Sequence, residues 1–256
     1  MKSAVAHRAF ASLKEAIADN EIRPVFQPVI RLADEQVVGF EVLARWSSSK
    51  FGDISPAEFI PYAEQNNMLD DLTSNLIRRA SKIAVTWPGE FFLAFNIAPT
   101  QFRDHNLRKL VLNALETAQF PQDRVVIEMT EESQVYNKVK ALEVMKNLVD
   151  DGLSFSLDDF GSGYGNIMRL RSYPFKYVKI DISLVEKITT NKDDEAVVAS
   201  IIELAHYWGY EVIAEGIERK EQAALLKKLN CPMGQGWLFS RPLEEKDVIT
   251  YIKNNT

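Results

Sequence analysis

Hydrophobic and polar positions follow two different periods along the chain. Apolar residues recur at helical spacing over residues 4–19, which predicts an amphipathic helix. Two apolar segments, 25–32 and 37–44, flank a polar turn and predict a strand–turn–strand unit. Pro24 and Pro28 indicate that the first strand is an edge strand or irregular, because proline cannot donate a hydrogen bond to a ladder.

Beyond this unit, a long helical stretch precedes a regular alternation of strands and helices. The stretch covers residues 56–85 and has a possible break near Asn66. We expect strands at 91–96, 125–129, 154–157, 177–180, 211–214 and 235–239, and helices at 107–118, 138–150, 194–208, 220–229 and 244–253. Repeated alternation predicts an α/β fold with a mainly parallel sheet. Eight strands in 256 residues match a (β/α)₈ barrel, and an open doubly wound sheet is the alternative that the pattern leaves open.

Composition narrows the class of protein. The chain is 46% hydrophobic and 26% charged, which excludes a disordered or fibrous protein. No linker or repeat divides it, so we expect an N-terminal helix over 1–20 and one barrel domain over 21–256. A net charge of −6 argues against a long nucleic acid as partner. One cysteine, no signal peptide and no long apolar run predict a cytoplasmic protein without a membrane span.

Polar residues stand at or beside the predicted strand ends. They are Asn96, Glu128, Asp158, Asp159, Lys179, Asp181, Glu215 and Gln235. In a barrel these positions share the carboxyl-end rim, where barrel enzymes carry out catalysis. Any one of them could be a helix cap or a turn residue. Carboxylates crowded on one rim need cations, however, and oxygen ligands select ions such as Mg²⁺ or Mn²⁺.

The adjacent carboxylates Asp158 and Asp159 are the most informative pair. At a strand-to-loop bend both can reach one cluster, so one carboxylate can bridge two ions while the other binds one. Two ions about 3.5–4 Å apart are a common device for phosphodiester hydrolysis. Lys179 could then orient the attacking water or neutralise the phosphorane. Its alternative role is a salt bridge to Asp181 or Asp159.

Two further segments bear on the rim. The glycine-rich segment 160–166 fits neither phosphate-loop fingerprint, so a lid over the metal site is the better interpretation. Glu131 could bond to that lid, or it could be a surface carboxylate. Strand periodicity puts Glu41, Leu43 and Arg45 on one face. Glu41 and Arg45 would look into the barrel mouth, where Arg45 suits a phosphate, or would form a buried ion pair.

Short motifs occur in a fixed order over about residues 23–243. They are QPV at Gln27, EVLARW at Glu41, FNIA around Asn96, EMTE at Glu128, DDFGSGY at Asp158, VKID at Val178, AEGIE at Ala214 and QGWLFSRP at Gln235. In this order they resemble the EAL-domain cyclic-di-GMP phosphodiesterases. The resemblance implies a modified TIM (β/α)₈ barrel with one antiparallel strand, and a hydrolase of bacterial second-messenger signalling. It would cut cyclic di-GMP to linear pGpG by two-metal activation of water.

The resemblance also implies roles for individual residues. The first Mg²⁺ or Mn²⁺ would be bound by Glu41, Asn96, Glu128 and Asp158. The second would be bound by Asp158 and Asp159, with Glu215 close by. Lys179 would hold the attacking water, and Glu41 and Glu215 would join it as catalytic groups. The substrate would contact Gln27, Leu43, Arg45, Asp181 and Gln235. Glu131 would anchor the lid, and a homodimer would form near residues 167–173 and the following β–α segment.

Departures from the family pattern are few. Val42 replaces alanine in the signature and should point away from the barrel mouth. Gly165 and Asn166 change the lid and put rate and regulation in question, not ligation. A catalytically silent receptor and an unrelated barrel enzyme for a sugar phosphate are the other hypotheses. The net charge does not exclude a small dinucleotide, because two divalent ions with Lys179 and Arg45 would make the rim net positive.

Overall fold

The computed structural model describes residues 10, 12–48, 50–103, 106–130, 138–161, 170 and 172–255. At its centre is one sheet with the strand order β1-β9-β8-β7-β6-β5-β4-β2-β3. A further pairing of β1 with β2 closes eight strands into a barrel and leaves β3 outside it. The strands are β1 (Ile22–Arg31), β2 (Gln36–Ser48), β3 (Gly52–Ile54), β4 (Phe92–Asn96), β5 (Val125–Thr130), β6 (Ser154–Phe160), β7 (Tyr177–Ile180), β8 (Glu211–Ala214) and β9 (Met233–Gly234). The closed barrel, and not the open sheet, is therefore confirmed.

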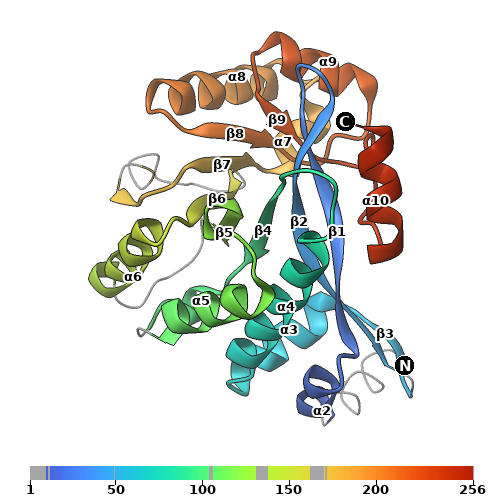
Figure 1. Cartoon of the computed structure of the whole chain (residues 1–256). Helices are drawn as coiled ribbons and strands as arrows, with labels where there is room; N and C mark the ends of the chain where they lie inside the picture. The colour runs from blue at the N-terminus through green and yellow to red at the C-terminus, as the bar shows by residue number, and fades with distance from the viewer. Residues whose placement is uncertain are drawn as a thin grey trace.

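Helices surround the barrel (Figure 1). They are α2 (Leu13–Ala18), α3 (Pro56–Gln65), α4 (Leu69–Ala84), α5 (Asn106–Ala118), α6 (Lys138–Asp150), α7 (Ile182–Lys187), α8 (Lys192–Tyr207), α9 (Lys220–Lys228) and α10 (Glu245–Asn254), with short 3₁₀ helices η1 (Pro99–Arg103) and η2 (Gln122–Arg124). The break expected near Asn66 separates α3 from α4. Within the described residues, no helix combines the length and apolar character needed to cross a membrane.

Strand β1 is the one antiparallel strand of the barrel. It pairs with β2 along its whole length and with β9 through only two residue pairs, while the other barrel strands run parallel. On the β9 side, Phe26 exchanges two backbone hydrogen bonds with Leu243. Pro24 and Pro28 are two residues away from Phe26, so their missing N–H groups face this sparsely paired side. The expectation of an irregular first strand is confirmed.

Two expectations about the end of the sheet need correction. The last strand is β9 and not 235–239, because the chain bends at Gly236 and a Cβ there would lie 2.1 Å from the Ile217 carbonyl oxygen. Gln235 thus follows this strand and does not open it. The short elements β3 and α7 were not predicted. Of the expected N-terminal helix the structure describes α2, and the expected lid is described only as far as Gly161.

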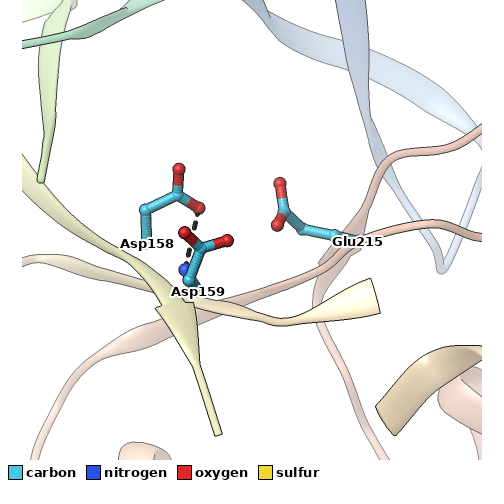
Figure 2. Close-up of side chains that lie close together, drawn as sticks. All are labelled: Asp158, Asp159 and Glu215. Atoms are coloured by element: carbon cyan, nitrogen blue, oxygen red, sulfur yellow. Dashed lines mark hydrogen bonds between the residues drawn. The ribbon is translucent and has the colours of Figure 1, made fainter. Parts of the chain in front are cut away.

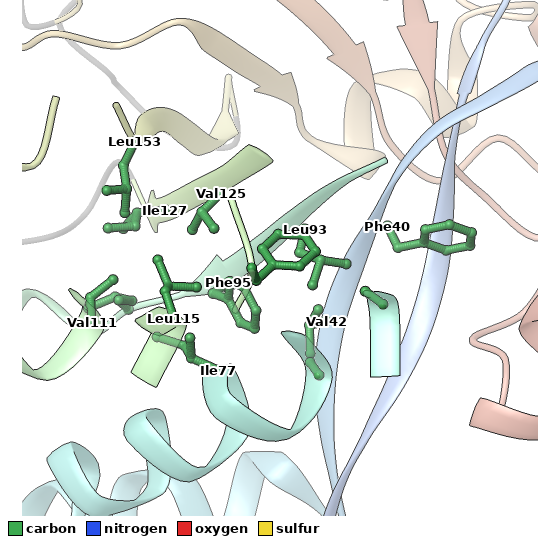
Figure 3. Packing of buried hydrophobic residues seen from close by; sticks show 14 of the residues in the cluster. Phe40, Val42, Ile77, Leu93, Phe95, Val111, Leu115, Val125, Ile127 and Leu153 are labelled. Carbon is green, nitrogen blue, oxygen red and sulfur yellow. The ribbon is translucent and has the colours of Figure 1, made fainter. Parts of the chain in front are cut away.

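The largest apolar cluster packs one side of the barrel wall against α4, α5 and α6. Figure 3 shows part of it, including Leu93 and Phe95 of β4. These two residues alternate with Ala94, which faces the barrel interior with a separate apolar group. Val42 belongs to the large cluster and is 2% exposed, as expected for a residue that points away from the mouth.

Candidate active site

The site is built as one layer of the barrel interior. Six apolar residues, one from each of six strands, form a plug inside the barrel: Val29, Ala94, Val126, Tyr177, Ile213 and Met233. Two positions toward the carboxyl end of the parallel strands stand Asn96, Glu128, Lys179, Glu215 and Gln235. Side chains two positions apart share a face, so these polar groups form the next layer above the plug. The fold therefore brings these five of the predicted strand-end polar residues to one rim.

Lys179 lies at the centre of this layer and is 1% exposed. Its Nζ is 2.8 Å from Oε1 of Glu215, 3.2 Å from Oε1 of Glu128, 3.2 Å from Oδ1 of Asp158 and 3.5 Å from Oε2 of Glu41. Lys179 thus forms ion pairs with four carboxylates. The alternative that the sequence left open was a single salt bridge from Lys179 to Asp181 or Asp159.

Two amide side chains connect the carboxylates. Asn96 Nδ2 donates to Glu41 Oε1 at 2.9 Å and to Glu128 Oε2 at 3.3 Å. Gln235 Nε2 donates to Glu41 Oε2 at 2.8 Å and to Glu215 Oε1 at 2.9 Å. Each amide therefore holds two carboxylates that come from different strands. We call the set of Glu41, Asn96, Glu128, Asp158, Lys179, Glu215 and Gln235 the carboxylate ring.

The ionisable groups of the ring have divergent pKa values. Burial raises the pKa of Glu128 well above its ordinary value; Lys179 opposes this effect, and the neighbouring carboxylates Glu41, Asp158 and Glu215 add to it. Burial likewise raises the pKa of Glu215, to about 7. Burial would lower the pKa of Lys179, but the surrounding carboxylates raise it well above its ordinary value. Burial also acts to raise the pKa of Glu41, yet Lys179 and the amide donors outweigh it and lower that pKa.

Asp159 joins the ring through an unusual backbone conformation. Its φ is +58°, and its N–H donates to Asp158 Oδ1 at 3.1 Å. Ligand atoms of Asp158, Asp159 and Glu215 lie within 4.8 Å of one another. Figure 2 shows the three side chains gathered in one place, with Glu215 facing the two aspartates. Burial and the neighbouring Asp158 raise the pKa of Asp159. The adjacent pair expected from sequence therefore does converge, with Glu215 opposite.

The described residues of the ring fit divalent cations. Four carboxylates around one lysine leave negative charge that the ring does not neutralise, and burial makes such an excess costly. The Gln235 side chain is buried, and its Oε1 has no hydrogen-bond partner among the described residues. Carboxylate and amide oxygens are the ligands that Mg²⁺ and Mn²⁺ prefer.

The other predicted site residues are not members of the carboxylate ring, and their contacts differ. Gln27 is half-buried and pairs in register with Glu41. Arg45 Nη1 donates to the Ala44 carbonyl oxygen, while Glu41 pairs with Lys179, so the alternative of a Glu41–Arg45 ion pair is not what forms. Asp181 caps α7 by accepting from the Ser183 N–H at 2.9 Å. Glu131 lies outside the described residues.

Sequence reasoning missed an apolar cavity beside the ring. The cavity has a volume of about 320 Å³, and Asn96 and Glu128 form part of its wall. Leu43 and Arg45 line it from β2, and helices α3 and α4 supply apolar residues such as Ile60 and Leu72. The apolar faces of these helices were readable, but nothing in the sequence indicated that they border the rim.

Comparison with known proteins yields one family and several relatives. The family model of the EAL domain matches residues 11–242. The cyclic di-GMP phosphodiesterase RocR of Pseudomonas aeruginosa is 31% identical over 248 residues, which are 96% of this chain and 63% of RocR. The structure of the EAL enzyme Bd1971 with cAMP and cyclic di-GMP has a TM-score of 0.89 at 30% identity, covering 98% of this chain and 70% of that one.

A further solved structure bears on the metal. BlrP1 of Klebsiella pneumoniae, in a complex with manganese and cyclic di-GMP, has a TM-score of 0.78 at 28% identity, covering 88% of this chain and 56% of BlrP1. The chain spans only 28% to 30% of the length of the first curated relatives that it matches.

Proposed function

The chain belongs to the EAL domain family, and on that premise we propose that it hydrolyses cyclic di-GMP to linear pGpG with two divalent ions, Mg²⁺ or Mn²⁺. The carboxylate ring is the observation that carries the proposal. Every predicted ligand in the described residues is retained, and five of them lie around or beside one buried lysine. The relatives that bind or hydrolyse cyclic di-GMP support the choice of substrate.

In this proposal the carboxylate ring and Asp159 supply two ligand sets. Glu41, Asn96, Glu128 and Asp158 would hold one ion, and Asp158, Asp159 and Glu215 would hold the other. The closeness of the last three side chains supports the second set. Bound divalent ions supply Lewis acidity at phosphate oxygens and lower the pKa of water.

The remaining groups position and neutralise. In the metal-free protein the surrounding carboxylates raise the pKa of Lys179 well above its ordinary value. We propose that Lys179 acts in the enzyme as the donor that holds the attacking water and offsets developing negative charge. Gln235 fixes the orientation of Glu41 and Glu215 through its two hydrogen bonds. Gln27, Leu43, Arg45 and Asp181 remain proposed substrate contacts, and Glu131 remains a proposed anchor of the lid.

Product analysis tests the proposal directly. Purified protein with Mg²⁺ or Mn²⁺ should convert cyclic di-GMP to pGpG, detected by chromatography and mass spectrometry. Asp158→Ala and Glu41→Ala should each abolish turnover and weaken binding of Mn²⁺ measured by calorimetry. Glu203→Ala, a change at an exposed carboxylate of α8, is the matched control. Absence of any product at high enzyme concentration would overturn the proposal.

A catalytically silent receptor is the competing hypothesis. It predicts that cyclic di-GMP binds in a calorimetric titration while no product forms with either ion. Retention of the whole ligand set in the described residues favours the enzyme.

The family resemblance also leads us to propose a cytoplasmic homodimer. Its expected contact segment, residues 167–173, lies largely outside the described residues. Light scattering should give about twice the chain mass of 29.1 kDa, and a monomeric mass at micromolar concentration would contradict it.

A further inference from the structure

The start of the short helix α7 lies between the two segments that carry Asp159 and Glu215. Asp181, the residue before α7, donates its N–H to the Phe160 carbonyl oxygen at 3.2 Å, and Phe160 directly follows Asp159. Glu215 N–H donates to the Ile180 carbonyl oxygen at 3.1 Å. The chain that leads into α7 is therefore bonded to both segments.

Ile182, the first residue of α7, packs directly on the backbone beside Glu215. Gly216 is the residue after Glu215, and a Cβ on it would lie 2.1 Å from Ile182 Cγ1 and 2.5 Å from Ile182 Cδ1. Gly216 also has a φ of +67°, which glycine adopts without strain. No space is left between the isoleucine side chain and this backbone, so Ile182 fixes how closely the Glu215 segment approaches α7.

Leu184 makes the equivalent contact with the segment of Asp159. A Cβ on Gly161, two residues after Asp159, would lie 2.6 Å from Leu184 Cδ1. Leu184 also packs against the apolar cluster between the sheet and α8, whereas Ile182 lies outside that cluster and is 50% exposed. Truncation of Leu184 would therefore disturb the core, while truncation of Ile182 would mainly remove the contact with Gly216.

The far end of α7 is held by groups that are not part of the carboxylate ring. Gln222 Nε2 of α9 donates to the Val185 carbonyl oxygen at 2.8 Å, and Arg219 Nη2 donates to the Glu186 carbonyl oxygen at 2.8 Å. Gln222 is 1% exposed, so water does not compete for its hydrogen bond. Because α7 is held at both ends, it is a fixed support for the two segments that it contacts.

We propose that Ile182 is a positioning residue for the second divalent ion. Through Gly216 it keeps the Glu215 carboxylate facing Asp158 and Asp159, the arrangement that Figure 2 shows. The inference rests on the proposed function, because it concerns the ion assigned to these three carboxylates. Mg²⁺ demands near-ideal ligand geometry, so a small shift of one carboxylate weakens binding.

The first ion should respond much less than the second. Three of its proposed ligands, Glu41, Asn96 and Glu128, come from β2, β4 and β5. None of these strands is a neighbour of β7 in the sheet, since β7 pairs with β6 and β8. A change at the start of α7 should therefore act selectively on one ion.

Calorimetric titration with Mn²⁺ tests this assignment without any need for turnover. The unchanged protein should bind two ions. Ile182→Ala should weaken one of them about ten-fold, the low end of the effect of groups that orient metal ligands, and change the other less than about two-fold. Ile182→Val should retain most of the affinity, because valine keeps a carbon at the Cγ1 position. Ile249→Ala, at a 36% exposed isoleucine of α10, is the matched control and should change neither affinity.

Two further measurements separate positioning from a purely structural role. In EDTA, Ile182→Ala should lower Tm no more than Ile249→Ala does, because half of Ile182 is already exposed. With cyclic di-GMP, excess Mn²⁺ should restore the kcat of Ile182→Ala but not that of Asp158→Ala, which lacks a proposed ligand. A larger drop in Tm, equal weakening of both ions or failure of excess Mn²⁺ to restore kcat would each overturn the inference.

The titration and the turnover assay together separate failure of the inference from failure of the proposed function. If the unchanged protein binds two ions and turns over, and Ile182→Ala alters neither affinity, the inference alone is overturned. If it binds two ions without turnover, and Ile182→Ala weakens one of them, the inference is supported and the proposed hydrolysis is overturned. Fewer than two bound ions in the unchanged protein would overturn both.

Discussion

Lys179 is the cation of the carboxylate ring, and the charge balance of the ring depends on it. Removing its cation would leave four buried or partly buried carboxylates facing one another. We predict that Lys179→Met lowers the free energy of unfolding of the metal-free protein by about 3–5 kcal/mol, the usual cost of breaking a buried ion pair. Urea denaturation in EDTA measures this change.

The control for this variant is Lys192→Met. Lys192 also pairs with a glutamate, at 2.7 Å, but its side chain is 91% exposed. Its substitution should cost less than about 1 kcal/mol, because solvent screens exposed pairs. Equal stability losses for the two lysine variants would contradict the assigned role of Lys179.

Glu215 makes the stability of the metal-free protein depend on pH near neutrality. Burial raises its pKa from 4.5 to about 7 in the folded protein. The folded state binds this proton more tightly than the unfolded chain, so the contribution to stability is complete below about pH 4.5 and is lost as pH rises through about 7. Glu215→Gln should therefore flatten the fall in unfolding free energy of the metal-free protein across this window. Urea melts at a series of pH values test this, and parallel profiles would contradict it.

The polar residues of the site could be named from sequence because each follows an apolar run at a strand end. Asn96, Glu128 and Lys179 are examples. Their contacts could not be predicted, because the ring depends on which strands are neighbours and on one local conformation. The φ of +58° at Asp159 has no sequence marker, since aspartate adopts that region only occasionally.

At the scale of elements, the last strand shows where periodicity fails. Residues 235–239 looked like a strand because Trp237, Leu238 and Phe239 are apolar. The real strand, β9, has only two residues, which is too short to show a period. The longer elements were predictable because their apolar faces repeat over several turns or pleats. The elements of three to six residues, β3 and α7, were missed for the same reason as β9.

The close packing after β9 makes Gly236 sensitive to substitution. We predict that Gly236→Ala lowers the free energy of unfolding by more than about 2 kcal/mol, because the added methyl group overlaps the Ile217 backbone. Gly209→Ala is the control, since Gly209 also has a positive φ but nothing lies within 4 Å of its Cβ position. That variant should cost about 1 kcal/mol from backbone strain alone. Chemical denaturation compares the two, and a similar cost for both would contradict the packing argument.

At the scale of the whole molecule, divalent ions should stabilise the fold. Ions that bind only the folded protein add about 2.7 kcal/mol at one hundred times their dissociation constant. For a chain of 256 residues this corresponds to a rise in Tm of roughly 5–10 °C. Thermal melts with Mn²⁺ and with EDTA measure the shift, and Asp158→Ala should abolish it. An unchanged Tm in the unmodified protein would contradict the proposed metal site.

The seam between β1 and β9 has a consequence for biosynthesis. The bond from Gln235 to Glu41 joins residues 194 positions apart, and the barrel closes through only two residue pairs at that seam. A ribosome that adds about 5–20 residues per second needs roughly 10–40 seconds to span this interval. Until then, the emerging chain lacks the donor that holds Glu41 and Glu215 in place. The complete ring therefore forms only after Gln235 has been added, at least this interval after Glu41.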